Sequence, residues 1–236
     1  MHCDNERAIA TLNVKGLTLL AAIAAALLSP AIAAEPEAAD AGCRQFLPDD
    51  TALRLGRVIG PGSAALLRDA PGCPGPAASC RSGFSARSGG TLLLGMERRH
   101  YACAFDAVSG ATGWILAARV AALPADPTPP LAAWIGTWRL YDNEIVLRQQ
   151  GSDIEADGEA YWPAKTVMPA NEGTFEGSAK PAGNRLHFGD DREGCIVDMA
   201  LVGSYLVVAD NRGCGGHNVS FTGVFTRRGR TRWRAR

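Results

Sequence analysis

The stretch from Gly194 to Phe225 has the clearest alternation of apolar and polar positions in the chain, and it predicts three short antiparallel strands. Gly203-Ser204 separates two apolar runs, and a Gly-Ser pair is typical of a two-residue hairpin turn. This turn sets Val202 opposite Tyr205. The register then continues outward from the turn, with Leu201 opposite Leu206 and Val197 opposite Asp210. Because side chains alternate between the faces of a strand, one face is then wholly apolar, with Val197, Met199, Leu201, Leu206 and Val208.

The same register brings two cysteines close together. Cys195 would lie opposite Arg212, which is two residues before Cys214 and points to the same face. A disulfide needs Cα atoms about 4.4–6.8 Å apart, and a small curl of the chain around Arg212 supplies that distance. We therefore predict a Cys195–Cys214 disulfide.

Short strands are also expected through the rest of the chain. Residues 43–123 contain only short apolar runs, punctuated by Gly and Pro, which is typical of a small β-barrel. The run PADPTPP at residues 124–130 predicts an extended linker. Residues 131–226 show about eight strand-like segments, including a hairpin turn at Asp157-Gly158 and a second hairpin joining Thr174–Ala179 to Asn184–Phe188. The expected fold class is all-β, with a small barrel followed by an antiparallel β-barrel or sandwich.

Two stretches resemble known families. The run HYACAFDAVSGATGWILAARVAAL contains a strand at Tyr101–Phe105, a turn near Ser109-Gly110 and then Gly113-Trp114-Ile115. This order resembles the C-terminal half of bacterial SH3-like (SH3b) domains, over roughly residues 64–123, although the segment from Cys73 to Cys80 departs from the pattern. The Gly-x-Trp at Gly136 is similar to the entry of small lipocalin-like barrels.

The SH3-like resemblance implies a binding module, which in exported bacterial proteins commonly takes peptide or cell-wall ligands. It implies Trp114 and Tyr101 as the aromatic residues of a ligand groove. The alternative is that Trp114 packs between two sheets, as strand aromatics usually do.

An apolar segment near the N-terminus predicts export. Leu17 to Leu28 has the length of a signal-peptide core, and Ala31-Ile32-Ala33 supplies small residues for cleavage. We expect a signal peptide over residues 1–33, a mature chain beginning near Ala34 or Glu35, and a periplasmic or extracellular location. A short membrane anchor is the alternative, but the apolar run is short for a span.

The cysteine count agrees with export. Six cysteines remain after removal of the signal peptide, and an even number without a Cys-x-x-Cys pair favours disulfides over a metal site. Besides Cys195–Cys214, four cysteines allow three pairings. We prefer Cys73–Cys80, across a Pro-Gly-Pro loop, which leaves Cys43–Cys103.

Charge is unevenly distributed in the chain. Its 24 basic and 24 acidic residues balance, yet six arginines lie within residues 227–236 and no acid accompanies them. We expect this tail to be disordered; it also offers a contact for anionic polymer or lipid. Export argues against nucleic acid as a partner.

Candidate catalytic and metal-ligating residues are few. Asp210, His217 and Ser220 include the residue types of a catalytic triad, but they lie within one hairpin and no Gly-x-Ser-x-Gly motif is present. Turn building explains them equally well. Asp153-x-Glu155-x-Asp157 begins like a calcium loop but lacks the glutamate at its twelfth position. We therefore expect no cofactor and no metal.

The pattern as a whole favours a non-catalytic, exported protein of the cell envelope. It would bind cell-wall peptide or glycan, or another envelope protein. Two alternatives stay open from the sequence: a hydrolase or hydrolase inhibitor that uses the C-terminal domain, and a small lipocalin-like carrier.

Overall fold

The computed structural model describes residues 42–43, 46–162, 171–190 and 194–227. The predicted signal peptide and residues 228–236 of the arginine-rich tail lie outside the described residues. Strands and short 3-10 turns make up the described elements, so the all-β prediction is confirmed. No helix of the described residues is long and apolar enough to cross a membrane.

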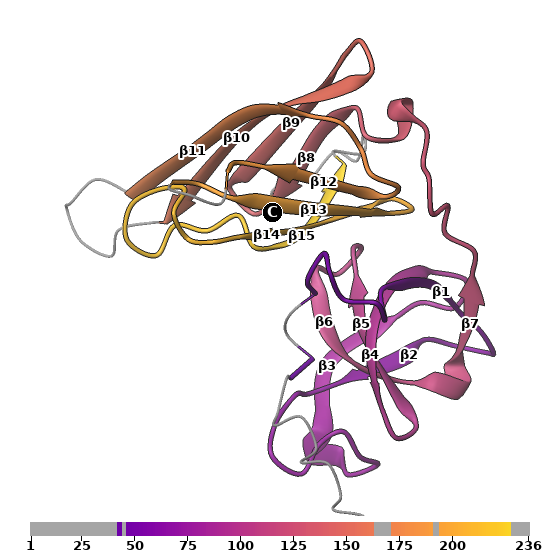
Figure 1. Cartoon of the computed structure of the whole chain (residues 1–236). Helices are drawn as coiled ribbons and strands as arrows, with labels where there is room; N and C mark the ends of the chain where they lie inside the picture. Colours follow the sequence, from indigo (N-terminus) through magenta and orange to yellow (C-terminus); the bar gives the residue numbers. More distant parts are fainter. Residues whose placement is uncertain (1–41, 44–45, 163–170, 191–193, 228–236) are drawn as a thin grey trace, which may run out of the picture. The chain divides into compact units, whose positions relative to one another are not determined.

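The first antiparallel sheet has seven strands in the order β3-β2-β6-β5-β4-β1-β7 (Figure 1). Its strands are β1 (Arg54–Val58), β2 (Ala64–Leu67), β3 (Arg81–Ala86), β4 (Thr91–Arg98), β5 (Tyr101–Asp106), β6 (Ala111–Leu116) and β7 (Val120–Leu123). Residues 124–130 then form neither helix nor strand before a 3-10 turn at Leu131–Ala133.

The second antiparallel sheet has eight strands in the order β11-β10-β9-β8-β15-β14-β13-β12. They are β8 (Gly136–Leu140), β9 (Asn143–Gln150), β10 (Asp153–Trp162), β11 (Asn171–Ala179), β12 (Arg185–Phe188), β13 (Val197–Val202), β14 (Tyr205–Asp210) and β15 (Gly223–Arg227). Each half of the sheet is an up-and-down meander, and pairing of β15 with β8 joins the halves. The result is a nearly closed barrel whose terminal strands are β11 and β12.

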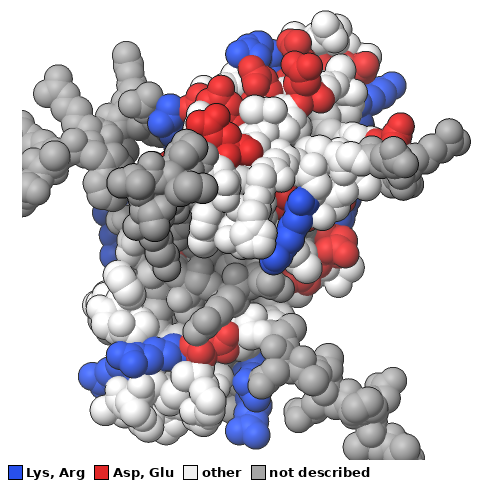
Figure 2. All heavy atoms as spheres, turned by 90° about the vertical axis from the view of Figure 1, so that its left-hand side faces the viewer, with Lys and Arg blue, Asp and Glu red and all other residues white. Residues whose placement is uncertain are grey.

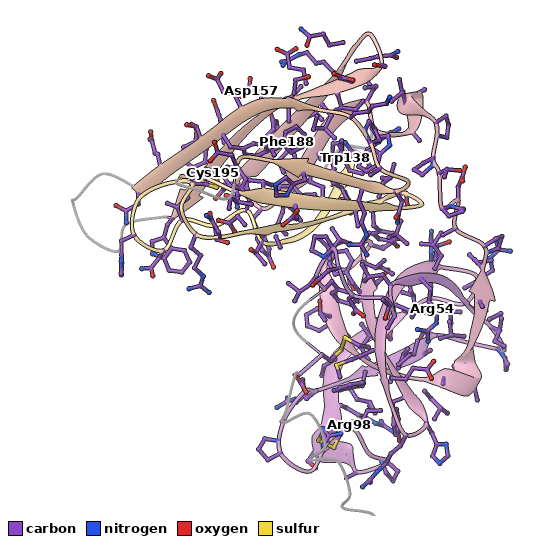
Figure 3. All side chains as sticks on the ribbon, viewed as in Figure 1. Arg54, Arg98, Trp138, Asp157, Phe188 and Cys195 are labelled. Atoms are coloured by element: carbon purple, nitrogen blue, oxygen red, sulfur yellow. A yellow bond between two sulfur atoms is a disulfide. The ribbon has the colours of Figure 1, made fainter. Side chains whose placement is uncertain are left out.

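Apolar side chains fill the interior of this barrel. Trp138 and Phe188 point inward while Asp157 points outward (Figure 3). The fully buried indole of Trp138 donates a hydrogen bond from Nε1 to the Trp134 carbonyl oxygen, at 2.8 Å. Interior and exterior residues alternate along β10 and β12, as a barrel wall requires.

The turn predicted at Asp157-Gly158 is wrong, because β10 runs straight through it. Gly158 serves packing instead: a Cβ atom there would lie 2.1 Å from Cε1 of Phe175, whose ring occupies that space. Burial of an aromatic ring contributes about 1.5–3 kcal/mol, more than a local turn preference does. The calcium-like sequence at Asp153 therefore lies in an extended strand and not in a loop.

The hairpin around Gly203-Ser204 is confirmed in its register, with Val202 opposite Tyr205 and Val197 opposite Asp210. The third strand of the meander, expected over Asn218–Phe225, starts later, at Gly223, and extends to Arg227. Arg227 therefore belongs to a strand and not to the tail, and its guanidinium lies 4.8 Å from the ring centroid of Trp138.

All three predicted disulfides are present: Cys43–Cys103, Cys73–Cys80 and Cys195–Cys214. Disulfides of this kind form and persist in an oxidising, non-cytoplasmic environment. The hairpin predicted between Thr174–Ala179 and Asn184–Phe188 is wrong. These segments fall in β11 and β12, and no ladder of hydrogen bonds joins the two strands.

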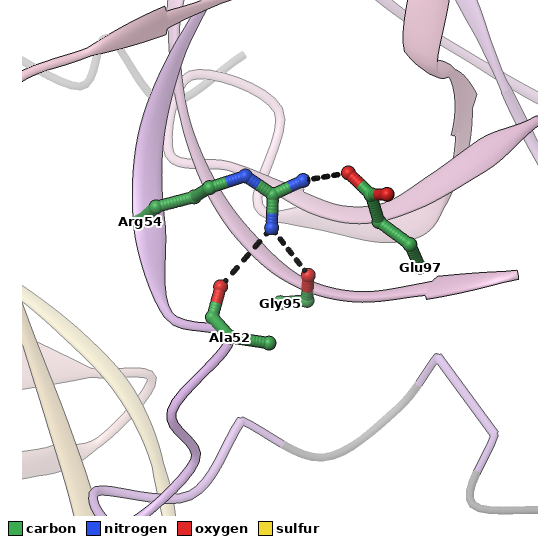
Figure 4. Close-up of polar contacts among 4 residues, drawn as sticks. All are labelled: Ala52, Arg54, Gly95 and Glu97. Carbon is green, nitrogen blue, oxygen red and sulfur yellow. Dashed lines mark hydrogen bonds and ion pairs between the residues drawn. The ribbon is translucent and has the colours of Figure 1, made fainter.

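A polar contact fixes the entry into the first sheet. Nη1 of Arg54 donates hydrogen bonds to the carbonyl oxygens of Ala52 and Gly95, at 3.1 and 3.0 Å (Figure 4). Nη2 of Arg54 pairs with the Glu97 carboxylate. Arg54 thus ties the start of β1 to β4, which is its neighbour in the sheet.

The side chain of Tyr205, including its hydroxyl group, is buried within the compact unit Asp40–Arg236. Its Oη donates a hydrogen bond to the Thr91 carbonyl oxygen at 2.9 Å, and its ring meets Phe105 edge to face. Burial, with a smaller effect of the Asp106 charge, raises the pKa of Tyr205 to about 12 from its usual value of 10.0.

This pKa predicts alkali sensitivity. The folded-state pKa lies above the unfolded one, so the stabilisation is complete below about pH 10 and is lost as pH rises toward 12. Urea unfolding between pH 9 and 12 should therefore show wild type losing stability relative to Tyr205→Phe, which has no hydroxyl to ionise. Tyr141→Phe is the control, because the Tyr141 side chain is 86 % exposed. Parallel losses in wild type and Tyr205→Phe would contradict the prediction.

Candidate functional site

A groove of about 740 Å³ opens at the seam between β11 and β12. The end of β11, the connection to β12, and strands β12, β13 and β14 line it, together with residues 47–49. Its volume lies in the range of pockets that bind small ligands. The groove lies where β11 and β12, although consecutive in the chain, do not pair.

Strand alternation places polar side chains at the surface of this groove and apolar ones beneath it. On β12, Leu186 and Phe188 are buried in the barrel core, while Arg185 and His187 are exposed. On β13, Met199 is buried and Asp198 is exposed. The groove therefore presents charged side chains to solvent, and the apolar side chains of β12 and β13 belong to the barrel core.

His187 and Asp198 form a polar pair on the rim. They lie directly opposite each other on β12 and β13, and His187 Nδ1 is 2.7 Å from Asp198 Oδ1. About half of each side chain is exposed. Opposite residues approach closely in a pair that is not backbone hydrogen-bonded, so the strand register alone creates this contact.

Two cations, Lys180 and Arg185, also line the groove. Lys180 and Arg185 are exposed, and neither forms an ion pair with an acid in the described parts of the chain. Arg185 is held in place through its backbone, which exchanges two hydrogen bonds with Ala182. The groove thus offers positive charge for a carboxylate or phosphate, next to a histidine and an aspartate.

Catalysis by the His187–Asp198 pair would need a nucleophile or an activated water. No described hydroxyl is hydrogen-bonded to His187, and all six cysteines of the expected mature chain are in disulfides. Ser178 lines the groove, but its Oγ lies 3.5 Å from Gln150 Oε1. The arrangement fits recognition of a charged ligand better than acyl transfer.

Trp114 is buried completely, and its Nε1 donates a hydrogen bond to Asp69 Oδ1 at 3.1 Å. The core alternative therefore holds for Trp114, and the groove role that the SH3-like resemblance implied is corrected. Tyr101 is partly buried and packs against the same hydrophobic cluster. These two residues do not form an exposed aromatic platform.

Asp210 and Ser220 do come together, but they organise a turn. Asp210 Oδ1 accepts hydrogen bonds from Ser220 Oγ at 2.5 Å, from Thr222 Oγ1 at 2.7 Å and from the Phe221 N–H at 3.2 Å. His217 is exposed, and its carbonyl oxygen accepts a bond from Asn171. The carboxylate fixes the chain that enters β15, which explains why that strand begins late.

Among the described residues, no group of three or more His, Cys, Asp or Glu is arranged to hold a metal ion.

A second charged surface covers β10 and β11, where Asp157 also pairs with Arg148 of β9 at 3.9 Å. Figure 2 shows acidic side chains gathered in the upper part of the view, and the exposed acids of these strands include Glu155, Asp157, Glu159, Glu172 and Glu176. Register sets Asp157 opposite Glu176 and Glu159 opposite Glu144, although like charges directly opposite are unfavourable. A hydrogen bond to Glu159 and the nearby carboxylates raise the pKa of Tyr161. This surface would repel an anionic polymer, so anionic groups of a ligand are better met at the groove.

The sequence alone does not reveal the groove. The sequence predicts a strand at Asn184–Phe188 that contains His187, but it does not predict the pairing of β12 with β13. The alternation of His187 with Leu186 and Phe188 is a signal for an exposed face.

No family model, no curated protein and no solved structure matches the chain.

Proposed function

We propose that this protein is an exported, non-catalytic binding protein of the cell envelope, and that its β11–β12 groove is the ligand site. The N-terminal sequence predicts export to the periplasm or beyond. Three disulfides support an oxidising location. The SH3-like resemblance of residues 64–123 points to the same class of protein.

One observation carries the proposal: the groove presents Lys180 and Arg185, without described acidic partners, beside the exposed His187–Asp198 pair. Unpaired cations on the rim of a hollow are suited to bind carboxylate or phosphate groups. Asp198 and Asp49, at the same groove, are suited to an amine. A ligand with charges of both signs, as in cell-wall peptides or protein segments, matches this distribution.

A hydrolase that uses His187 and Asp198 is the second candidate, because their 2.7 Å contact resembles the base and its orienting carboxylate in a catalytic triad. A carrier of small apolar ligands is less well supported. Large side chains, including Trp134, Trp138, Phe221 and Phe225, occupy the interior of the barrel.

Pelleting with purified peptidoglycan tests the proposal. We expect the mature protein to pellet without release of soluble fragments, and Lys180→Gln/Arg185→Gln to bind about tenfold more weakly, because two charge-assisted contacts are lost. Arg57→Gln/Arg87→Gln is the matched control, since it removes the same charge from exposed positions outside the groove. Release of fragments that stops in His187→Ala would favour the hydrolase. Equal binding by both double variants would exclude the groove as the site.

A further inference from the structure

The edge of β12 presents backbone groups that no strand of the barrel uses. Leu201 donates its N–H to the Asn184 carbonyl oxygen at 2.8 Å, and Asn184 precedes the opposed pair Arg185 and Ala200. Because antiparallel residues alternate between bonded and non-bonded pairs, Leu186 and Phe188 turn their backbone groups toward β13. Arg185 and His187 therefore turn theirs away from β13, toward the groove.

Within the described residues, His187 is the residue of β12 whose outward backbone groups take part in no ladder. The outward N–H and C=O of Arg185 are occupied by Ala182, at 3.2 and 2.9 Å. The N–H and C=O of His187 belong to no pairing with β11, since the two strands share no ladder. The backbone N–H and C=O of His187 therefore both face the groove, in the arrangement that an edge strand offers to a neighbouring strand.

The opposite wall of the groove has the same character. The Glu172 carbonyl oxygen on β11 accepts a hydrogen bond from Gly216, on the side away from β10. By the same alternation, Ser178 turns its N–H and C=O outward, and Ser178 lines the groove. The loop around Gly215 covers only the beginning of β11, so the end of this strand faces the groove instead.

We propose that the groove binds an extended peptide by strand addition to the edge of β12, with a carboxylate of the peptide on Lys180 and Arg185. This inference rests on the proposed function and specifies the ligand of that site. The backbone of His187 supplies the hydrogen bonds, and the two cations supply charge complementarity. The exposed side chains of Arg185, His187 and Asp198 lie beside the site of the added strand.

The test separates backbone from side-chain recognition at His187. The probe is a fluorescein-labelled peptide, Thr-Val-Thr-Val-Thr-Glu, with a free C-terminus, and its binding to the mature protein is followed by fluorescence polarisation. His187→Ala keeps the backbone N–H and should bind within about threefold of wild type, whereas His187→Pro removes that N–H and should bind at least about tenfold more weakly. Proline is tolerated on an edge strand where the N–H points outward. An equal loss in both variants would overturn the proposal in favour of side-chain recognition.

Peptide variants keep the test decisive if His187→Pro does not fold. Two analogues carry N-methyl groups on alternate backbone amides, one set on odd and one on even positions. We expect at least one of them to bind wild type about tenfold more weakly, because methylation removes the donors of a β-ladder. Unchanged binding of both analogues would overturn strand addition.

Charge recognition is tested by a double comparison. A probe with glutamine in place of glutamate and an amidated C-terminus should bind wild type about tenfold more weakly, and Arg185→Gln should weaken only the acidic probe. Equal binding of the acidic and amidated probes would overturn the carboxylate assignment. Concentration-dependent dimerisation that His187→Pro abolishes would instead identify a second copy of this chain as the occupant.

Strand addition and envelope binding are distinguished by different results. If peptidoglycan pelleting depends on Lys180 and Arg185 while no peptide binds, strand addition fails and the envelope-binding function stands. If the peptide binds at His187 while envelope fractions do not pellet, the ligand is a protein segment from another source. Loss of both results would remove the groove as a binding site.

Discussion

Trp114→Ala is expected to lower the free energy of unfolding by about 3–5 kcal/mol, as removal of a large buried side chain does. Trp114 is completely buried on β6, and its indole N–H is hydrogen-bonded to Asp69. Stabilities of small domains are about 5–15 kcal/mol, so this loss would leave the first sheet marginal. Urea unfolding of the mature protein, with far-UV circular dichroism as the signal, measures the effect.

Two variants control for this result. Trp162→Ala makes the same change at a side chain that is 45 % exposed, and it should alter stability by less than about 0.5 kcal/mol. Trp114→Phe keeps most of the packing and loses the bond to Asp69, so an intermediate loss is expected. A Trp114→Ala protein with wild-type stability and no ligand binding would contradict the core position and restore the groove role.

Removal of the Cys195–Cys214 disulfide should lower stability by about 3 kcal/mol in the chain-entropy model, because the bond closes a loop with a sequence separation of 19. Removal of this disulfide should also increase local opening of the chain around it. Gly215 bridges to Gly173 on β11, and the Gly216 N–H bonds to the Glu172 carbonyl oxygen, so the disulfide anchors the loop that covers the start of β11. In Cys195→Ala/Cys214→Ala, faster hydrogen exchange is expected in residues 171–175 and 213–218.

Cys73→Ala/Cys80→Ala is the matched control. This disulfide spans a sequence separation of 7, so its removal should cost less, about 2.5 kcal/mol, and should leave exchange in β11 unchanged. Equal exchange of residues 171–175 in the wild type and in Cys195→Ala/Cys214→Ala would show that the loop is held by its own hydrogen bonds.

Local information was sufficient for several features of this protein. The register of the hairpin at Gly203-Ser204 follows from the turn residues and the two-residue alternation of its strands, and a slip by one position would turn the apolar face to solvent. The same register predicted the Cys195–Cys214 pair. The even cysteine count indicated disulfides, because it is a property of composition. The Gly and Pro punctuation indicated an all-β chain, because turn residues act locally.

Contacts between residues far apart in the chain determined other features of the fold, including the course of β10 and the burial of Trp114. Asp157-Gly158 is a turn signal by itself, yet the ring of Phe175 fills the space beside Gly158 and keeps β10 extended. Trp114 could serve a groove or a core from its strand position alone, and only the sheet packed around it shows that it is buried.

The groove is the clearest case of a feature that the tertiary structure alone determined. Its existence depends on which two strands are left unpaired when β15 joins β8, and that pairing connects residues far apart in the chain. His187 and Asp198 are eleven positions apart, and their contact follows from a strand pairing that no turn signal marks. Composition and alternation determine which residues are buried in each strand, whereas the closure of the barrel determines which polar residues share a site, because only closure brings distant edges together.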